Sequence, residues 1–189
     1  MGVLTVWRHP RPRGVEGRCI GTTDVPVDRR KAKRLAHRIR AWARRHVAPR
    51  IVLTSPLRRG ADVGRWLAAW GWVHRVDARL TELDFGHWDG RRWDDIGAAA
   101  VDAWCADFVH HTPGGGESVA TLLGRCAGFI DATGDGSDVC IVGHAGWISA
   151  ALWRERVGSA WPLAADWPAA RGYGERVALA LRRVPPESA

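Results

Sequence analysis

The sequence lacks the patterns of a membrane-spanning protein, an exported protein or a cysteine-based metal site. No apolar run is long enough to cross a bilayer, and the N-terminus has no charged region followed by an apolar stretch and a cleavage site. No two cysteines form a CxxC pair, which argues against a zinc site or a redox motif. Three of the four cysteines stand in apolar contexts that are typical of reduced thiols. We therefore expect a cytoplasmic protein with no membrane partner and no metal.

Internal repeats, low-complexity tracts and long linkers are also missing. The chain has 189 residues, which is enough to close one sizeable core. These observations predict a single domain over residues 1–189.

Negative charge is in the minority, because 20 Asp and Glu stand against 28 Lys and Arg and the formal net charge is +8. Such a balance is compatible with nucleic-acid binding. The densest basic run, from Arg29 to Arg45, is interrupted at helical spacing by Leu35, Ile39 and Trp42, which predicts an amphipathic helix with a basic outer face. Aromatic residues are not interleaved with these charges along the chain, as base stacking would require. We therefore expect a solvated surface and no nucleic-acid partner.

Short apolar runs alternate with helical stripes of apolar residues, which predicts an α/β fold. Strands are expected at 3–7, 51–53, 73–76, 138–142 and 176–181. Helices are expected at 30–46, from about Pro56, from Glu117 to Ile130 and from 144 to 157. Residues 84–116 are irregular, with helical patches at 93–96 and 101–109. The alternation predicts a three-layer α/β/α sandwich around a mainly parallel sheet.

Cationic and imidazole side chains follow three of the predicted strands. Arg8 and His9 follow the first strand, Arg59 lies just beyond the second, and His144 follows the strand at 138–142. Ligands of open α/β sheets bind at the carboxyl edge of the strands, so we expect these residues to converge there. Helix N-termini at the same edge add N–H groups and partial positive charge. Such a pocket suits a dianion, and phosphate is the obvious candidate.

Glu82 supplies a general acid. It follows the third predicted strand and precedes the half-apolar segment 83–86, which would shield the carboxyl from water and suit a proton donor. Taken singly, Glu82 would be a solvated turn residue, His144 a helix cap and Arg59 an ordinary helix-surface residue. Their recurrence at one sheet edge favours the functional interpretation.

Four motifs in chain order resemble those of the histidine phosphatase superfamily, also called the phosphoglycerate mutase-like family. They are Arg8-His9-Pro10, with Pro in place of the family's Gly, Thr54-Ser55-Pro56-Leu57-Arg58-Arg59, the acid-bearing segment Leu80 to Gly90, and Gly143-His144-Ala145-Gly146. The resemblance implies a phosphoglycerate mutase-like α/β/α fold. It also implies a phosphomonoesterase that needs neither metal nor cofactor.

The resemblance implies a role for each residue at the sheet edge. His9 would be the nucleophile and form a phosphohistidine, and Glu82 would donate a proton to the leaving alcohol. Arg8, Arg59 and His144 would bind the phosphoryl oxygens.

Within the superfamily, the closest resemblance is to the α-ribazole phosphatases of cobalamin biosynthesis. It rests on the segments Gly17 to Asp24 and Pro113 to Ser118, although Ile20 stands where those relatives carry an aromatic residue. It implies further substrate contacts from Thr23 and Ser118. It also implies that residues 85–116 form a capping insertion over the active site.

Three tryptophans of that insertion, Trp88, Trp93 and Trp104, would pack on an aromatic or sugar leaving group, or else form the core of the segment itself. The expected partner is therefore a small phosphorylated metabolite, with α-ribazole 5′-phosphate as the first candidate. Another small-molecule phosphatase or a phosphoglycerate mutase-type enzyme is the alternative. A catalytically inactive basic binding module is the alternative of a different class, and a homodimer is left open.

Overall fold

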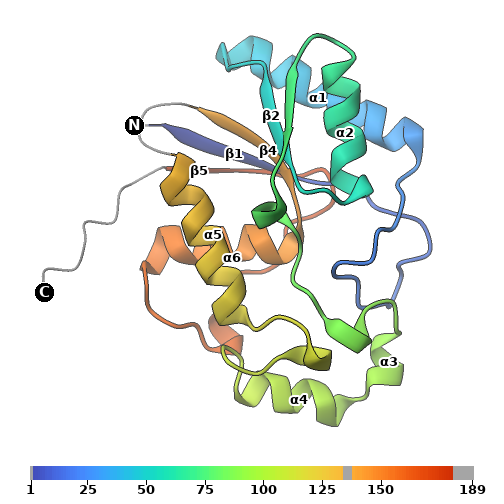
Figure 1. Cartoon of the computed structure of the whole chain (residues 1–189), viewed down its shortest axis with the longest axis vertical. Coiled ribbons are helices and arrows are strands. Elements are labelled where there is room, and N and C mark those ends of the chain that lie inside the picture. The colour runs from blue at the N-terminus through green and yellow to red at the C-terminus, as the bar shows by residue number, and fades with distance from the viewer. Residues whose placement is uncertain (1, 134–137, 181–189) are drawn as a thin grey trace, which may run out of the picture.

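Five strands form one sheet in the computed structural model, which describes residues 2–133 and 138–180 (Figure 1). The sheet order is β3-β2-β4-β1-β5. The strands are β1 (Val3–Arg8), β2 (Ile51–Thr54), β3 (Val73–Val76), β4 (Val139–Gly143) and β5 (Arg176–Ala180). β1 to β4 run parallel to one another, and β5 pairs antiparallel with β1 at the edge.

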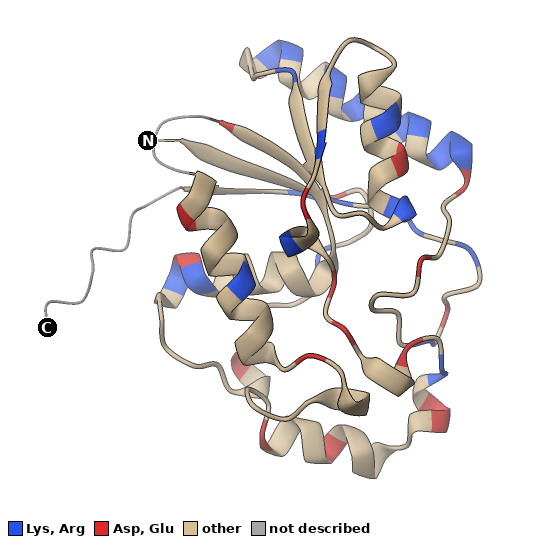
Figure 2. Cartoon of the chain, viewed as in Figure 1, with Lys and Arg blue, Asp and Glu red and all other residues tan. Residues whose placement is uncertain are grey.

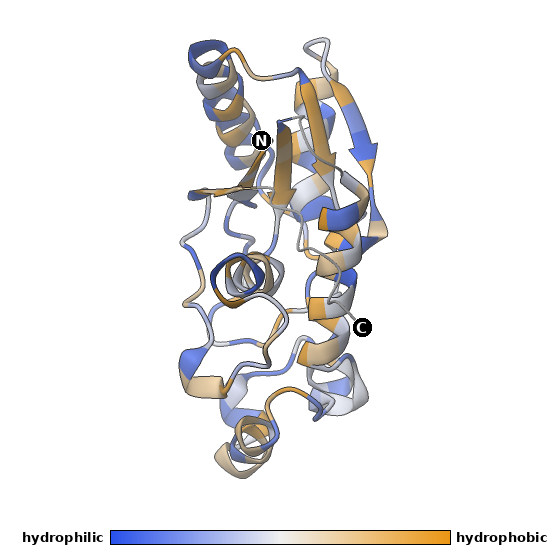
Figure 3. Ribbon diagram, turned by 90° about the vertical axis from the view of Figure 1, so that its left-hand side faces the viewer, coloured by the Kyte–Doolittle hydropathy of each residue, from blue (hydrophilic) through white to orange (hydrophobic). Residues whose placement is uncertain are grey.

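Helices cover both faces of this sheet. They are α1 (Arg29–His46) and α2 (Arg58–Ala68) on one face, and α5 (Val119–Thr133) and α6 (Ala145–Val157) on the other. Within β1, Leu4 and Val6 pack with α5 and α6, whereas Trp7 packs with α1 and α2, because successive side chains of a strand point to opposite faces. The strands are mainly hydrophobic, while α1 alternates hydrophobic and hydrophilic turns (Figure 3). The predicted three-layer α/β/α sandwich is confirmed.

The neighbouring strands β1 and β4 lead to opposite faces of the sheet. The chain leaves β1 toward α1 on one face, and it leaves β4 directly into α6 on the other. In open α/β sheets, such a switch point leaves a crevice at the carboxyl ends of the two strands, where ligands bind. The register pairs Arg8 with Gly143, so the residues that follow both strands begin side by side.

Residues 85–116 form short elements away from the sheet, in the lower part of Figure 1. They are η2 (Gly86–Trp88), α3 (Trp93–Ile96), α4 (Ala98–Ala106) and η3 (Pro113–Gly115). Gly114 is required there, because its φ is +61° and a Cβ would lie 2.1 Å from the carbonyl oxygen of Phe85. Backbone hydrogen bonds also join residues 17–19 to residues 90–93. The N-terminal loop and this segment therefore form one wall beside the sheet edge.

Several predicted boundaries move in the structure. Pro56 lies outside α2, which begins at Arg58, rather than in its first turn. The second patch of the irregular region is a helix at 98–106, not 101–109, because Gly97 with φ +87° precedes it. α5 begins at Val119, two residues later than expected. Leu181, which we assigned to the last strand, lies outside the described residues. Among residues 2–133 and 138–180, no helix is long and apolar enough to span a membrane.

Candidate active site

His9 and His144 meet at the carboxyl ends of β1 and β4. The His9 N–H donates to the carbonyl oxygen of Gly143 at 3.0 Å, which extends the ladder between the strands by one residue. The two imidazole centroids lie 5.0 Å apart, and both side chains are buried. The sheet register therefore brings together two histidines that lie near opposite ends of the sequence.

The hydrogen bonds of His9 fix its tautomer. Nδ1 lies 2.8 Å from the carbonyl oxygen of Pro10. A carbonyl oxygen only accepts, so Nδ1 carries the proton and Nε2 keeps its lone pair. His9 is thus oriented as a nucleophile whose reactive atom is Nε2.

Arg59 lies beneath the two histidines and is only 1 % exposed. Its Nη1 and Nη2 groups donate to the carbonyl oxygens of Thr23 and Gly21, and its Nε donates to Nδ1 of His144 at 3.2 Å. Because Nδ1 of His144 accepts, Nε2 carries the proton and donates to Oγ of Ser55 at 2.7 Å. In the structure His144 therefore orients Arg59, and its contact with a phosphoryl oxygen stays a prediction.

Burial keeps both imidazoles neutral. It lowers the pKa of His9 to about 3, and the positive charge of Arg59 acts in the same direction. Burial likewise lowers the pKa of His144 well below its usual value, again with help from Arg59. A neutral His9 is what nucleophilic attack requires.

Glu82 is buried against the N-terminus of α6. Its carboxylate accepts from the N–H of Gly146 at 2.9 Å and from the N–H of Leu83 at 3.0 Å. A Cβ on Gly146 would lie 2.5 Å from Oε1 of Glu82. Only glycine at position 146 therefore leaves room for the carboxylate.

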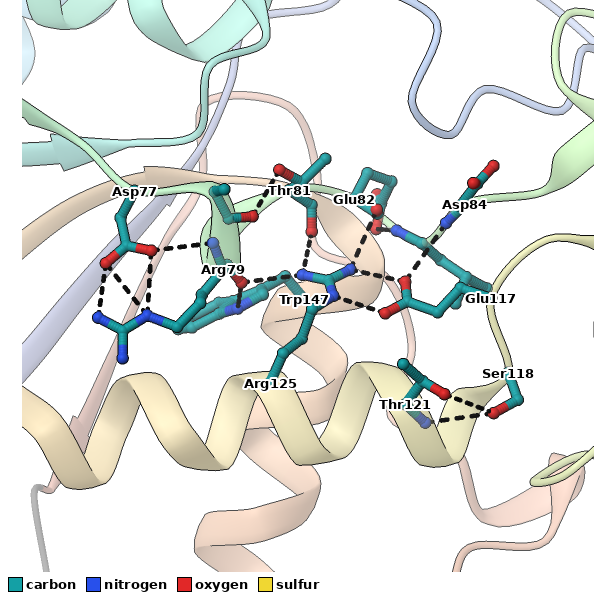
Figure 4. Close-up of polar contacts among 12 residues, drawn as sticks. Asp77, Arg79, Thr81, Glu82, Asp84, Glu117, Ser118, Thr121, Arg125 and Trp147 are labelled. Atoms are coloured by element: carbon teal, nitrogen blue, oxygen red, sulfur yellow. Dashed lines mark hydrogen bonds and ion pairs between the residues drawn. The ribbon is translucent and has the colours of Figure 1, made fainter.

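The backbone that carries Glu82 is held by Arg125 of α5 (Figure 4). The Arg125 guanidinium donates to the carbonyl oxygens of Arg79, Thr81 and Glu82 at 2.6–3.1 Å. It also forms a two-bond ion pair with Glu117 at 2.6 and 2.8 Å. Sequence reasoning missed Arg125, because its partners are main-chain atoms that no sequence motif reveals.

Arg8 lies against Tyr173, which sequence reasoning also missed. The Arg8 guanidinium carbon is 3.9 Å from the Tyr173 ring centroid, and its Nη1 donates to the carbonyl oxygen of Arg171. The same ring lies 5.5 Å from the His9 imidazole. Nε of Arg8 is buried and has no hydrogen-bond partner among the described residues, so Arg8 keeps a donor for an anion.

Comparison with known proteins identifies the family to which these residues belong. The model of the histidine phosphatase superfamily, branch 1, matches residues 4–166, which include both histidines, Arg59 and Glu82. The chain belongs to the histidine phosphatase superfamily. Among curated protein sequences, none matches it.

Several solved structures resemble this histidine phosphatase along nearly its whole length. A mycobacterial glucosyl-3-phosphoglycerate phosphatase is 25 % identical with a TM-score of 0.76, and the match covers 95 % of this chain and 90 % of that one. A protein named mycobacterial hydrolase 1 is 27 % identical with a TM-score of 0.76, over 94 % and 90 % of the two chains. A protein of Thermus thermophilus, TTHB049, is 23 % identical with a TM-score of 0.68, over 93 % and 92 %, and supports the fold alone.

A cavity of about 250 Å³ opens beside the candidate catalytic residues of this histidine phosphatase. Arg8, Glu82 and Gly146 are among its lining residues. Six aromatic side chains also line it, namely Phe85, Trp93, Trp104, Phe108, Trp167 and Tyr173. Four of the six come from residues 85–116. That this segment forms a cap over the active site stays a prediction. The cavity is therefore suited to a substrate whose leaving group has a flat, apolar part.

Three other residues that we expected near the substrate, Trp88, Thr23 and Ser118, contact other parts of the protein. Trp88 is buried against Trp104 and does not line the cavity, so it belongs to the core of its segment. Thr23 contributes its carbonyl oxygen to Arg59. Ser118 accepts a hydrogen bond from the N–H of Thr121 at the start of α5. Direct substrate contacts of Thr23 and Ser118 stay predictions. Among the described residues, no group of three or more His, Cys, Asp or Glu is placed to hold a metal ion.

Proposed function

We propose that this protein hydrolyses phosphomonoesters of small molecules through a phosphohistidine at His9. One observation carries the proposal. The His9 tautomer is fixed with Nε2 free, at the same sheet edge as the arginines Arg8 and Arg59 and beside the cavity that Glu82 lines. The protein's membership of the histidine phosphatase superfamily, and its similarity to a glucosyl-3-phosphoglycerate phosphatase, support the same class of reaction.

In the first step, Nε2 of His9 attacks phosphorus in line with the ester oxygen. The P–N bond forms as the P–O bond to the alcohol breaks, and Glu82 gives its proton to the departing oxygen. Arg8 and Arg59 stabilise the charge on the three equatorial oxygens. The products are a free alcohol and a phosphohistidine.

In the second step, water attacks the phosphohistidine. Glu82, now a carboxylate, accepts a proton from the water while the P–N bond breaks. Inorganic phosphate leaves, and both residues return to their starting states.

The magnitude of the rate acceleration decides which groups matter most. Enzymes accelerate phosphate-monoester hydrolysis by up to about 10²¹-fold, whereas a single acid or base contributes about 10²–10⁴-fold. Most of the barrier reduction must come from positioning and from stabilisation of charge. This explains why Arg59 is buried and held by three hydrogen bonds, since a fixed guanidinium needs no reorganisation during the reaction.

The aromatic cavity favours α-ribazole 5′-phosphate as the substrate, because its benzimidazole base is flat and apolar. Trp93 and Trp104 are placed on that cavity. Glucosyl-3-phosphoglycerate is the second candidate, because the mycobacterial structure with 25 % identity is named for that activity. A sugar ring also packs on tryptophan, and the exposed Arg18 on the cavity wall would pair with a carboxylate.

Phosphate release from a panel of substrates tests the proposal. The panel holds α-ribazole 5′-phosphate, glucosyl-3-phosphoglycerate, 3-phosphoglycerate and p-nitrophenyl phosphate. We expect the highest kcat/KM with α-ribazole 5′-phosphate. A higher value with glucosyl-3-phosphoglycerate would move the assignment to the second candidate. Turnover of 3-phosphoglycerate without phosphate release would show a mutase, and no reaction with any ester would favour the binding module.

The covalent step has its own test. Rapid acid quenching should not be used, because phosphohistidine is labile in acid, so the reaction is stopped with alkali and analysed by mass spectrometry. The wild type should carry one phosphate on the peptide that contains His9, and the His9→Ala variant should carry none and hydrolyse no ester. Full activity of His9→Ala would end the assignment of the nucleophile.

A further inference from the structure

Helix α1 carries many positive charges, and no negative charge on the helix balances them (Figure 2). Its sequence, Arg-Arg-Lys-Ala-Lys-Arg-Leu-Ala-His-Arg-Ile-Arg-Ala-Trp-Ala-Arg-Arg-His, contains no Asp or Glu. Among the described residues, no Lys or Arg of α1 forms an ion pair. Acidic residues lie on other elements, several of them on the segment in the lower part of Figure 2.

Several of the positive charges of α1 stand at positions that are unfavourable within a helix. Arg29, Arg30 and Lys31 occupy the first turn, where the helix dipole favours negative charge. Cations also repeat four residues apart, as in Arg30 and Arg34, and like charges at that spacing repel each other. A helix that keeps such unfavourable charges without ion-pair partners among the described residues is expected to have an anionic partner outside the chain.

Aromatic rings lie among these charges, contrary to the impression from the sequence. Trp66 of α2 lies under two cations of α1, with Arg29 at 5.0 Å and Lys33 at 4.9 Å from its ring centroid. Trp70, in the turn after α2, lies 4.4 Å from the His37 ring and 5.3 Å from Arg40. The sequence could not show this, because the rings come from a second helix.

We call this surface the α1–α2 face and define it by Arg29, Lys33, His37, Arg40, Trp66 and Trp70. The two tryptophan centroids are 5.8 Å apart, so the rings form one continuous aromatic strip. Both are half-buried, and cations cover part of each.

A cavity lies at each end of this strip. One, of about 580 Å³, is lined by Trp70 and Trp72 together with Arg40, Arg44 and Arg50. The other, of about 420 Å³, is lined by Trp66 together with Arg29, Arg58 and Arg65, and also by Asp62, which forms an ion pair with Arg65. Both combine an indole with several guanidinium groups, so each offers a place for a ring and for phosphate.

We infer that the α1–α2 face binds single-stranded nucleic acid. A positive groove that follows the backbone, with aromatic rings on which bases stack, is the arrangement by which proteins bind single strands without sequence preference. Binding would transfer Arg29, Lys33 and Arg40 from the indole rings to phosphates and open the rings to bases. A duplex fits less well, since its bases are already stacked.

A membrane fits this face less well than a nucleic acid does. The apolar stripe of α1, including Leu35, Ile39 and Trp42, is buried against the sheet and α2. The helix therefore has no apolar face to insert among lipids, which interfacial helices require. The inference does not depend on the proposed phosphatase activity, because the α1–α2 face shares none of its six residues with the catalytic group.

Fluorescence anisotropy of a labelled dT12 oligonucleotide measures the binding, between 50 and 200 mM salt. Each neutralised phosphate of a single strand contributes a slope of about −0.7 to log K against log salt. Contacts from four cations, namely Arg29, Lys33 and Arg40 of the face and Arg44 of the adjoining cavity, predict a slope of about −3. Heparin, which is anionic but has no bases, reports the contribution of charge alone.

Two variants separate charge from stacking. The Lys33→Gln/Arg40→Gln/Arg44→Gln variant should reduce the slope by about 2 in magnitude, since three phosphate contacts are lost. Its control, Arg75→Gln/Arg91→Gln/Arg156→Gln, removes the same charge from other exposed positions and should change the slope little. The Trp70→Leu variant should weaken dT12 binding about fivefold or more and leave heparin binding unchanged. The matched control Trp161→Leu, at an exposed position outside the face, should behave as the wild type.

All variants should retain phosphomonoesterase activity, which shows that they fold. Equal loss of affinity in both charge variants would overturn the inference, because general charge would then explain the binding. An unaltered dT12 affinity in Trp70→Leu would overturn it as well. Stronger binding to vesicles rich in phosphatidylserine than to dT12, or self-association at low salt that the oligonucleotide does not disperse, would assign the face to a membrane or to a second copy.

Discussion

A single hydrogen bond determines which nitrogen of His9 carries the proton and which keeps its lone pair. The carbonyl oxygen of Pro10 holds the proton on Nδ1, and Gly would provide the same carbonyl in the family's usual motif. Proline at this position removes a backbone N–H but not the carbonyl that His9 needs. The departure from the family motif therefore leaves the chemistry of His9 intact.

His9 should stay neutral, with its proton on Nδ1, from pH 7.5 down to pH 5. Burial and the charge of Arg59 lower its pKa to about 3, so it gains no proton over this range. Nitrogen-15 NMR of the ring resonances measures both properties, and the spectrum of the His9→Gln variant assigns the signal. A titration midpoint near 6.5, the ordinary histidine value, would contradict the prediction.

The Gly146→Ala variant should damage proton donation specifically. A Cβ at this position would lie 2.5 Å from Oε1 of Glu82, so the carboxyl must move away from its hydrogen bond to the backbone. We expect kcat for an alkyl phosphate to fall about 10²-fold, within the usual contribution of a general acid. With p-nitrophenyl phosphate, whose leaving group needs little protonation, the loss should be much smaller.

Gly124 provides the control for that substitution. It lies on α5, and a Cβ there would meet no atom within 4 Å. The Gly124→Ala variant should keep full activity with both substrates. An equal loss with both substrates in Gly146→Ala would refute a role for position 146 in placing the acid.

At the level of helices and strands, α5 holds the backbone segment that carries Glu82 through the side chain of Arg125. Arg125 donates to three carbonyl oxygens of the segment 79–82. It therefore positions Glu82 through the backbone and does not bind the Glu82 carboxyl group. The Arg125→Lys variant keeps the charge opposite Glu117 but cannot reach all these acceptors, because an ammonium lacks the planar fork. We expect kcat for alkyl phosphates to fall about tenfold while KM changes little.

The Arg125→Ala variant should in addition lose stability. Glu117 is largely buried, and removing its partner leaves a charge unpaired, which costs about 3–5 kcal/mol. Arg154→Ala is the matched control, because Arg154 has the same side-chain exposure of 19 % and pairs with Asp131 away from the site. If kcat of the Arg125→Lys variant fell by the same factor for alkyl and p-nitrophenyl esters, Arg125 would have only a structural role.

The strands of the sheet could be predicted from the sequence, but which strands pair with one another could not. The apolar runs at 3–7 and 138–142 indicate buried strands, whereas nothing in either run shows that β1 pairs with β4. The predicted convergence of His9 and His144 depended on that pairing and on the general rule for open α/β sheets. Tyr173 escaped prediction for the same reason, since β5 brings its loop back beside β1 only in three dimensions.

At the level of the whole molecule, α1 differs from the other helices that cover the sheet in carrying charge of one sign only. α1 is entirely basic outside its apolar stripe, while Asp94, Asp95 and Asp102 lie on the segment beside the cavity (Figure 2). The overall charge of +8 could be counted from the sequence. The basic outer face of α1 could also be predicted from its spacing. The positions of Trp66 and Trp70 among the cations could not, because they depend on how α2 packs on α1.

Stability should fall as the pH decreases below about 6.5. His9 and His144 are buried and neutral in the folded protein, because their pKa values are lowered, whereas both gain protons near pH 6.5 in the unfolded chain. The unfolded state therefore binds more protons, and the free energy of unfolding decreases with falling pH. Two such groups give a slope of up to about 2.7 kcal/mol per pH unit.

Urea denaturation between pH 7.5 and 5 measures this slope. The His144→Gln variant removes one of the two groups and should about halve the slope, even though its stability at pH 7.5 is lower. A slope that His144→Gln leaves unchanged would show that acid destabilisation arises from carboxylates elsewhere, since those regain protons only at lower pH.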